Sequence, residues 1–347
     1  MKKICIVGAG IFGTTLALIL SKKKNIRIDI YERNKDILNE TSLKNQQRFH
    51  LGYHYPRSKI TIKECLESFD SFKSNLGNTF LKSKNYYAIS KNDSRINYEN
   101  YIEVLNEMNL PFKKVSLDFF KKNTIQGAIE VEEKIINISK VRKFLKYLLA
   151  KKNINFFLNT HVNLNDSFLK SYDHVILTTY SENNENLKPF NLIKKKKIYY
   201  QLVEKIVIHP PKHLIKKSIV LMDGNFFCID PYEERGLSIL GSVKNSIIDK
   251  KNSVYAKNLL SNRYLESYLF INKKNSLFKK IKKDFCKVFK NFEKAKYYKS
   301  FYSVRSTYKN KNDDRVTQII KYKNLSIVHA GKWINCFLTG KKIAKSL

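Results

Sequence analysis

The first 33 residues fall into three blocks that differ in how apolar and polar positions are arranged. KKICIVG and IRIDIYER are near-continuous apolar runs, which are typical of strands covered on both faces of a sheet. The segment between them, IFGTTLALILSKKK, has a helical pattern and a basic last turn. This order predicts a βαβ unit of about 30 residues.

Similar apolar runs recur further along the chain. NINFFLNTHVNL and DHVILTTY resemble the first two strands, so we expect them in the same sheet. Residues 197–250 alternate strand-like runs with turns and predict an antiparallel sheet. The tail closes with a strand, LSIVHAG, and a last helix, KWINCFLTGKKIAKSL. The remaining helices are predicted at 62–76, 97–109, 138–153 and between 254 and 292.

The segments of the first sheet are separated in the chain by the segments of the second. We therefore predict an α/β fold in which a discontinuous Rossmann-like nucleotide-binding domain carries an inserted α+β substrate domain, built on the antiparallel sheet. A chain of 347 residues is long enough to bury a large core. The nucleotide-binding domain is expected to comprise 1–80, 136–190 and 300–347, and the substrate domain 81–135 and 191–299.

Three glycines stand between the first strand and the first helix. Gly8, Gly10 and Gly13 form G-x-G-x-x-G, and Glu32 closes the second strand. In such a motif the first glycine permits a tight turn, the second lets the backbone approach a pyrophosphate, and the third lets helix and strand pack closely. The helix N-terminus attracts the phosphates and the carboxylate accepts from a ribose hydroxyl, which disfavours the 2′-phosphate of NADP. The motif by itself leaves FAD and NAD open.

The next informative segment is QQRFHLGYHYPRS, residues 46–58, whose histidines, aromatics and arginines surround a single glycine. Together with the run YERNKDILNETSLKN before it, this segment resembles the flavoprotein superfamily of D-amino-acid oxidase, sarcosine oxidase and glycerol-3-phosphate dehydrogenase. The resemblance implies an FAD-binding domain, and we expect the FAD to be bound non-covalently. It places Thr41 and Ser42 near the pyrophosphate, Arg48 and His50 alongside the flavin, and Gly52 in close backbone contact with the ring.

Three later segments resemble the same family in the same order. NTHVNL contains Val162, which the resemblance places at the adenine, and DHVILTTY ends with Thr178 and Thr179 near the cofactor. SIVHAGKWINCF carries Gly331 and Lys332 on the pyrimidine side of the flavin. The residues expected to bind the cofactor are Gly8, Ala9, Gly10, Ile11, Phe12, Gly13, Glu32, Arg33, Thr41, Ser42, Arg48, His50, Gly52, Val162, Thr178, Thr179, Gly331, Lys332 and Trp333.

FAD chemistry implies removal of a hydride from a carbon that bears nitrogen or oxygen, while the protein positions the substrate and excludes water. In the family an arginine meets the carboxylate or phosphate of the substrate. Arg305, in FYSVRSTY, resembles that arginine without its usual Gly-x-Arg-Pro context, and a structural ion pair is the alternative role. His50 can accept a substrate proton or make a structural hydrogen bond. The catalytic candidates are His50, His54, Tyr55, Arg57 and Arg305.

Histidine and cysteine spacing predicts neither a metal site nor a disulfide. His50 and His54 are four residues apart, as metal ligands on a helix are, but Gly52 and Pro56 interrupt a helix and no third ligand is evident. The five cysteines lie far apart without a C-x-x-C pair, which favours free thiols in a reducing compartment. Some relatives attach the flavin covalently, but nothing in the spacing around Cys336 requires this.

The net charge of +36 is spread over the whole chain, and lysine dominates over arginine. A nucleic-acid site would concentrate charge and favour arginine, so we expect no dedicated nucleic-acid binding. Weak association with an anionic membrane surface stays open, and an anionic small substrate would gain from the field. The apolar run after MKK contains spaced glycines and no small-residue cleavage site, so a cytoplasmic location is expected.

The sequence therefore predicts an FAD-dependent oxidoreductase that removes a hydride from a small anionic amine or hydroxy compound and passes electrons to an unidentified acceptor. Two alternatives stay open. One is a flavin-dependent sugar mutase or isomerase without net redox, and the other is a basic membrane- or nucleic-acid-associated binding protein without catalysis.

Overall fold

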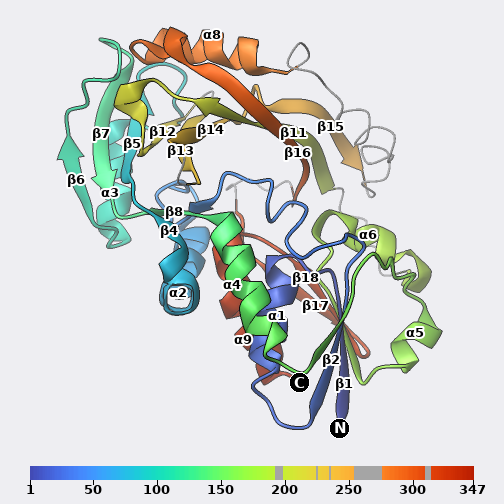
Figure 1. Ribbon diagram of the computed structural model, residues 1–347. Coiled ribbons are helices and arrows are strands. Elements are labelled where there is room, and N and C mark those ends of the chain that lie inside the picture. The colour runs from blue at the N-terminus through green and yellow to red at the C-terminus, as the bar shows by residue number, and fades with distance from the viewer. Residues whose placement is uncertain (192–197, 224–225, 234–235, 254–275, 309–313) are drawn as a thin grey trace.

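The computed structural model describes residues 1–191, 198–223, 226–233, 236–253, 276–308 and 314–347. Its elements gather into two parts, each built on one large sheet (Figure 1). Both chain termini lie at the end of the first part that is remote from the second sheet. The site described below lies between the two parts.

The first part is a six-stranded sheet in which only β17 runs antiparallel to its neighbour. The central strands are apolar along their length because helices cover both faces, and Ile4, Ile6, Val175 and Ile176 are fully buried. In sheet order the strands are β17 (Gln318–Tyr322), β18 (Leu325–His329), β10 (His174–Leu177), β1 (Lys2–Val7), β2 (Ile26–Tyr31) and β9 (Ile154–Phe157).

Helices α1, α4 and α9 lie side by side on one face of this sheet, and α5 and α6 lie on the other (Figure 1). Asparagines start two of them: Asn137 accepts from the backbone N–H of Lys140 in α4, and Asn165 caps α5 in the same way. The bounds are α1 (Ile11–Leu20), α4 (Ile138–Ala150), α5 (Asp166–Lys170), α6 (Asn183–Asn186) and α9 (Cys336–Lys345), with short turns η2 (Tyr180–Glu182), η3 (Lys188–Phe190) and η7 (Trp333–Asn335).

The second part is a nine-stranded sheet that is antiparallel except where β5 pairs with β12. Helix α8 lies across one face and buries Phe278, Ile281 and Phe285 against it (Figure 1). The strands are β5 (Lys84–Ser90), β6 (Phe112–Val115), β7 (Ile125–Val131), β11 (Ile198–His209), β12 (Lys217–Met222), β13 (Phe227–Tyr232), β14 (Leu237–Ser242), β15 (Ile247–Ser253) and β16 (Lys296–Tyr308). The accompanying helices are α3 (Tyr98–Glu107), α8 (Phe278–Val288), η4 (Lys212–Leu214) and η6 (Phe292–Lys294).

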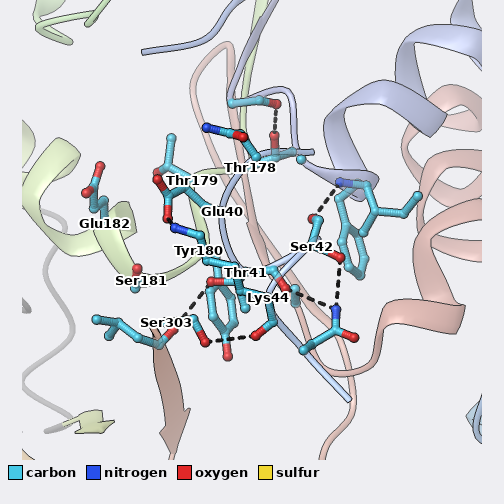
Figure 2. A pocket seen from close by; sticks show the side chains of 18 of the residues that line it. Glu40, Thr41, Ser42, Lys44, Thr178, Thr179, Tyr180, Ser181, Glu182 and Ser303 are labelled. Atoms are coloured by element: carbon cyan, nitrogen blue, oxygen red, sulfur yellow. Dashed lines mark hydrogen bonds and ion pairs between the residues drawn. The ribbon is translucent and has the colours of Figure 1, made fainter. Parts of the chain in front are cut away.

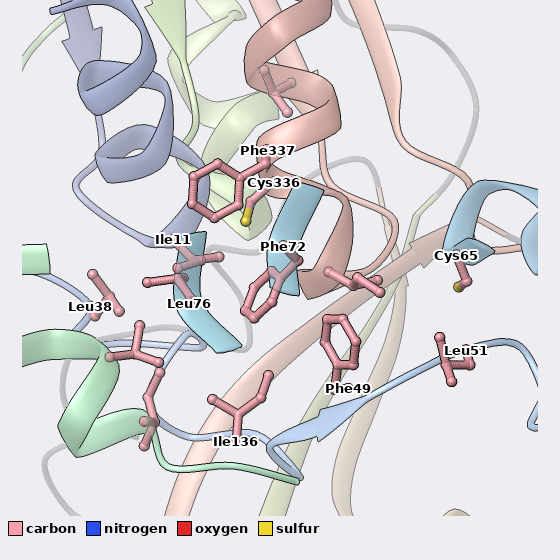
Figure 3. Close-up of a cluster of buried hydrophobic side chains, with 14 of the residues drawn as sticks. Ile11, Leu38, Phe49, Leu51, Cys65, Phe72, Leu76, Ile136, Cys336 and Phe337 are labelled. Atoms are coloured by element: carbon pink, nitrogen blue, oxygen red, sulfur yellow. The ribbon is translucent and has the colours of Figure 1, made fainter. Parts of the chain in front are cut away.

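A small three-stranded sheet and one long helix join the two parts. Phe49 packs on Phe72 of the helix with ring centroids 4.8 Å apart, and Phe72 meets Phe337 of α9 at 5.9 Å (Figure 3). These contacts hold the segment 46–58 between the two large sheets. The elements are β3 (Arg48–Phe49), β8 (Lys134–Ile136), β4 (Phe80–Leu81), α2 (Lys59–Leu76) and η1 (Gly77–Thr79).

The predicted fold is confirmed: β1, α1 and β2 form the βαβ unit, β9 and β10 join its sheet, and an antiparallel-type sheet is inserted. Helix α2 begins at Lys59 rather than at 62, because the Ser58 hydroxyl caps it. Of the helical region predicted between 254 and 292, residues 254–275 lie outside the described residues, and α8 lies in the rest. The domain division stays a prediction, and its boundary at residue 300 falls within β16.

Candidate active site

A cavity of about 370 Å³ opens at the carboxyl ends of β1, β2 and β10. Ligands bind at this edge in open sheets of this kind. Gly8 follows β1, Glu32 follows β2, and Thr178 follows β10, and all three line the cavity. We call this space the first cavity.

The three glycines of the turn differ in what their missing side chains allow. Gly8 has φ +101°, and a Cβ there would lie 2.9 Å from the Thr178 carbonyl oxygen. A Cβ at Gly13 would lie 2.0 Å from the Gly8 carbonyl oxygen, so this glycine allows α1 to pack on the turn. Gly10 is different, because it lines the first cavity and its Cβ would approach only the Ser42 hydroxyl, at 3.2 Å.

The Glu32 carboxylate is held at the rim of the first cavity by backbone donors. Its Oε2 accepts from the Ala9 N–H at 2.8 Å, and its Oε1 accepts from the Asn34 N–H at 2.9 Å. Next to it, Arg33 forms an ion pair with Glu182 of η2, across the end of the sheet. Backbone donors thus fix the Glu32 carboxylate, and its contact with a ribose stays a prediction.

The loop after β2 closes the first cavity from the side. Ser42 accepts from the Ile11 N–H at 3.0 Å, so its hydroxyl meets the first turn of α1 (Figure 2). The Thr178 hydroxyl donates to the Gly8 carbonyl oxygen at 2.8 Å and holds the glycine turn from the opposite side. Thr41 faces β16, where its hydroxyl donates to the Val304 carbonyl oxygen at 3.4 Å. The glycine turn is therefore supported from two sides, by the loop that carries Ser42 and by the end of β10.

A second cavity of about 1050 Å³ lies between the parts, against the nine-stranded sheet. Its lining carries eight Lys or Arg side chains and three Asp side chains. The two cavities meet at a junction, which we define by the residues that line both: Gln46, Arg48, His50, Tyr180, Val203, Lys205, Arg305, Ala330, Gly331 and Lys332. A group bound at the junction can therefore contact ligands in both cavities.

A buried ionic network forms the floor of the junction. The Arg48 guanidinium pairs with Glu133 at 3.1 Å and with Asp230, and all three are nearly inaccessible to solvent. Glu133 also accepts from the Tyr87 hydroxyl at 2.6 Å and from the Leu51 N–H at 2.9 Å. Burial opposes ionisation of Glu133, but its hydrogen bonds and the facing Arg48 hold its pKa below the usual value.

The two histidines lie beside this network, with ring centroids 5.2 Å apart. Burial lowers the pKa of His50 to about 4, and burial lowers that of His54 as well, so both rings are neutral near pH 7. Lys332 stacks on the Tyr55 ring with Nζ 4.2 Å from the centroid, and burial lowers its pKa to about 7. The junction thus holds neutral rings next to a cation that can lose its proton.

The structure gathers most of the predicted residues around the two cavities. All five catalytic candidates line the second cavity. Arg57 pairs there with Asp223, and Arg305 donates to the Gln201 side-chain oxygen at 2.8 Å through Nε. The cofactor candidates in the wall of the first cavity are Gly8, Gly10, Ile11, Phe12, Glu32, Arg33, Thr41, Ser42, Arg48, His50, Val162, Thr178, Thr179, Gly331, Lys332 and Trp333.

Three cofactor candidates lie outside that wall. Ala9 and Gly13 are buried in the turn, where they hold Glu32 and pack α1. Gly52 lines neither cavity; it has φ +119°, and a Cβ there would lie 2.8 Å from a methyl carbon of Ile62. The glycine is therefore explained by packing against α2, and contact with a flavin ring stays a prediction.

Sequence reasoning missed Glu133, Asp230 and Lys205. Asp230 is a single acid within the apolar strand β13, and Glu133 follows Glu132 in the connection between β7 and β8. Both acids meet Arg48 only after folding. The one available signal was that an acid inside an apolar strand, as in FCIDPY of β13, requires a buried partner. For Lys205, the alternation along β11 indicated which residues share a face of the strand. It did not indicate which of the two faces meets the cavity.

Within the described ranges, no group of three or more His, Cys, Asp or Glu side chains is arranged to hold a metal ion. No helix in the same part of the chain is long and apolar enough to span a bilayer. Cys336 is fully buried next to Phe337 in the core and lines neither cavity (Figure 3).

Comparison with known proteins gives a consistent match. The family model described as FAD dependent oxidoreductase matches residues 3–330. An FAD-dependent monooxygenase of Fusarium mangiferae is 22% identical over 246 residues, which is 70% of this chain and 64% of that protein. A second such monooxygenase, from Aspergillus flavus, is 41% identical over 70 residues, or 20% of this chain and 16% of its own. The chain thus spans less than two thirds of these relatives.

Solved structures share the fold over nearly the whole chain. Glycine oxidase from Geobacillus kaustophilus has a TM-score of 0.74 at 12% identity and covers 99% of this chain and 94% of its own. The reduced L-α-glycerophosphate oxidase of Mycoplasma pneumoniae with FAD bound has the same TM-score at 14% identity, over 99% and 94%. At such identities the likeness concerns the fold.

Proposed function

The chain belongs to the family of FAD-dependent oxidoreductases, and on this premise we propose that it oxidises a small anionic amine or hydroxy compound. The substrate would lose a hydride from the carbon that bears its nitrogen or oxygen. The observation that carries the proposal is the junction, where a cavity of dinucleotide-binding type opens into a cation-rich second cavity.

The residues of the first cavity fit FAD. Gly8 and Gly10 leave the backbone open beside the N-terminus of α1, where N–H groups and the helix dipole favour a pyrophosphate. The Glu32 carboxylate retains lone pairs for ribose hydroxyls after accepting from Ala9 and Asn34. The flavin end would then reach the junction beside His50.

When bound, FAD accepts the hydride and later yields its electrons to a separate acceptor. The chain's own contribution is charge, position and proton handling. Arg305 and Lys332 line both cavities and supply positive charge for the acidic group of the substrate. Lys332 can hold or release a proton near pH 7, whereas His50 enters as a neutral ring that accepts a proton only against its low pKa.

The excess of cations in the second cavity supports an anionic substrate. Its eight Lys or Arg side chains face three Asp side chains, and two of these acids, Asp223 and Asp314, already accept hydrogen bonds from Arg57 and Ser58. A carboxylate or phosphate would offset the remaining charge, and a neutral compound would not. The two alternative functions are not favoured, because the matched family consists of oxidoreductases.

The test is anaerobic titration of the FAD-loaded protein with small amino and hydroxy acids, each paired with its amide or methyl ester. We expect the acids to bleach the visible flavin spectrum and the uncharged partners to do so much less. Equal bleaching by acid and ester would contradict the anionic substrate, and bleaching by none of a broad panel of acids and their uncharged partners would contradict the proposed substrate class.

A further inference from the structure

Lys205 lies where the two cavities meet, and no role has been assigned to it. It stands on β11, whose neighbouring side chains alternate between the two faces of the sheet. Val203 and Lys205 line both cavities, whereas the intervening Glu204 is buried and accepts from the Ser300 hydroxyl. The period of the strand therefore directs Lys205 to the junction.

We propose that the Lys205 ammonium binds the acidic group of the substrate, a carboxylate or a phosphate, at the junction. This inference rests on the proposed function and names the residue that selects an anionic substrate. It differs from the prediction for Arg305, which came from a resemblance, because Lys205 is identified by its contacts alone.

Lys205 has hydrogen-bond donors that no side chain in the described part of the chain uses. Its Nζ donates to the side-chain oxygen of Gln46 at 3.1 Å, and no carboxylate of the described residues lies within ion-pair distance. An ammonium has three donors, so two remain for a ligand. A neutral amide oxygen orients the ammonium without cancelling its charge.

The Gln46 side chain, which accepts from Lys205, is itself fixed by hydrogen bonds. Its amide nitrogen donates to Asp230 at 2.8 Å and to the Ile239 carbonyl oxygen at 3.0 Å. A Cβ at Gly241 would lie 2.7 Å from the Gln46 oxygen, so this glycine of β14 makes room for the amide. The lysine is thus held by a preformed support, as a binding residue requires.

Lys205 lies next to the buried ionic network of Arg48, Glu133 and Asp230. Arg48 faces two buried carboxylates, Glu133 and Asp230, and Lys205 reaches Asp230 through Gln46. Lys205 therefore stands next to this network without pairing directly with either carboxylate, and its ammonium borders both cavities. The Asp230 carboxylate favours the charged form of Lys205 without occupying its remaining donors.

The pKa of Lys205 is consistent with this role. Burial and the neighbouring Arg305 lower the pKa of Lys205, Cys228 and Asp230 raise it, and the net value is about 8. The ammonium is therefore mostly protonated at pH 7 and loses its proton near pH 8. Binding of an anion through Lys205 should weaken as the pH rises through this value.

The experiment measures binding of two inert anions, acetate and inorganic phosphate, to the FAD-loaded protein through the shift of its visible flavin spectrum. The variants are Lys205→Met, which keeps the length of the side chain, and Lys205→Arg, which keeps its charge. Lys113→Met is the matched control, because this lysine is exposed on β6 and lines neither cavity. The FAD content of every variant is measured in parallel.

We expect Lys205→Met to weaken binding of at least one anion by about tenfold or more, the range of a hydrogen bond to a charged group. Its FAD content should stay at the wild-type value, its residual affinity should no longer fall near pH 8, and Lys205→Arg should restore part of the affinity. The control should bind both anions as the wild type does.

Unchanged anion affinity and pH dependence in Lys205→Met would overturn the inference while leaving an anionic substrate in place. Loss of FAD from Lys205→Met, with normal retention in Lys205→Arg, would assign the lysine to the cofactor and overturn it too. If the wild type binds neither anion and uncharged amines or alcohols bleach the flavin, the anionic substrate itself is wrong, and the inference falls with it.

Discussion

The two cavities are built in different ways. The first cavity has the glycine turn, the ends of three strands and the first turn of α1 in its wall, and Glu32 in that wall is held by N–H groups. The second cavity is shaped by side chains from both parts of the molecule, with a large excess of cations. A turn that requires glycine can be recognised in the sequence, because only glycine fits where a Cβ would meet neighbouring backbone atoms. A cavity lined by side chains from distant segments has no such local pattern.

The largest effect is expected at the first cavity. Gly10→Val should abolish FAD retention, because Gly10 lines the cavity and the added branched side chain would fill the space beside Ser42. The measurement is the flavin absorbance per protein after purification and after incubation with excess FAD. Gly77→Ala is the control, since φ is −61° there and a Cβ would make only ordinary contacts with the side chains of Lys73, at 3.4 Å, and Phe80, at 3.9 Å. A Gly10→Val protein that retains flavin would place the cofactor elsewhere.

The next effect concerns the floor of the junction. Arg48→Met should lower the free energy of unfolding by about 3–5 kcal/mol, because Glu133 and Asp230 would be left buried without their cation. Urea unfolding of the FAD-free protein measures it. Lys59→Met, which breaks the exposed pair with Glu107, should cost no more than about 1 kcal/mol. Equal losses in the free energy of unfolding for the two substitutions would show that the buried network of Arg48, Glu133 and Asp230 does not stabilise the fold as described.

A smaller, pH-dependent effect should come from His50. Its folded-state pKa of about 4 lies below the value of 6.5 expected for an exposed histidine, so the unfolded chain binds the proton more readily. The wild type should therefore lose about 2 kcal/mol of stability relative to His50→Asn between about pH 7.5 and about pH 5. Urea unfolding at both values tests this, with His209→Asn, an exposed residue of β11, as control. A constant difference between wild type and His50→Asn would mean that His50 is not buried as described.

The smallest effect is expected at Arg305. Its Nε and Nη2 already donate to Gln201, so Arg305→Met should weaken binding of an anionic substrate by only about 3–10-fold, without loss of FAD. Titration of the flavin spectrum with the substrate or with acetate measures the change. Gln201→Leu should alter the affinity less than Arg305→Met does, because it removes a support and not the charge. A loss of FAD in Arg305→Met would instead assign this arginine to the cofactor.

The sequence predicted the fold through two local patterns. The apolar runs around G-x-G-x-x-G became β1, α1 and β2, and the alternation in 197–250 became strands β11 to β14 of the second sheet. The segment 46–58 was singled out for its composition, and it contributes Gln46, Arg48, His50, His54 and Arg57 to the second cavity. Gly52 was expected at the ring, whereas its contact with Ile62 gives it a packing role that no local pattern indicated.

The sequence by itself determined the glycine turn between β1 and α1, because the close contact that requires glycine at Gly13 is made with Gly8, a near neighbour in the chain. Only the tertiary structure decided which charged side chains surround the second cavity. Asp230 and Lys205 come from two different strands, β13 and β11, and Glu133 comes from the connection between β7 and β8. No local pattern indicated the direction of these three side chains. Packing of the two parts selected the side, since burial of an ionic group is tolerated only where a partner from another segment meets it.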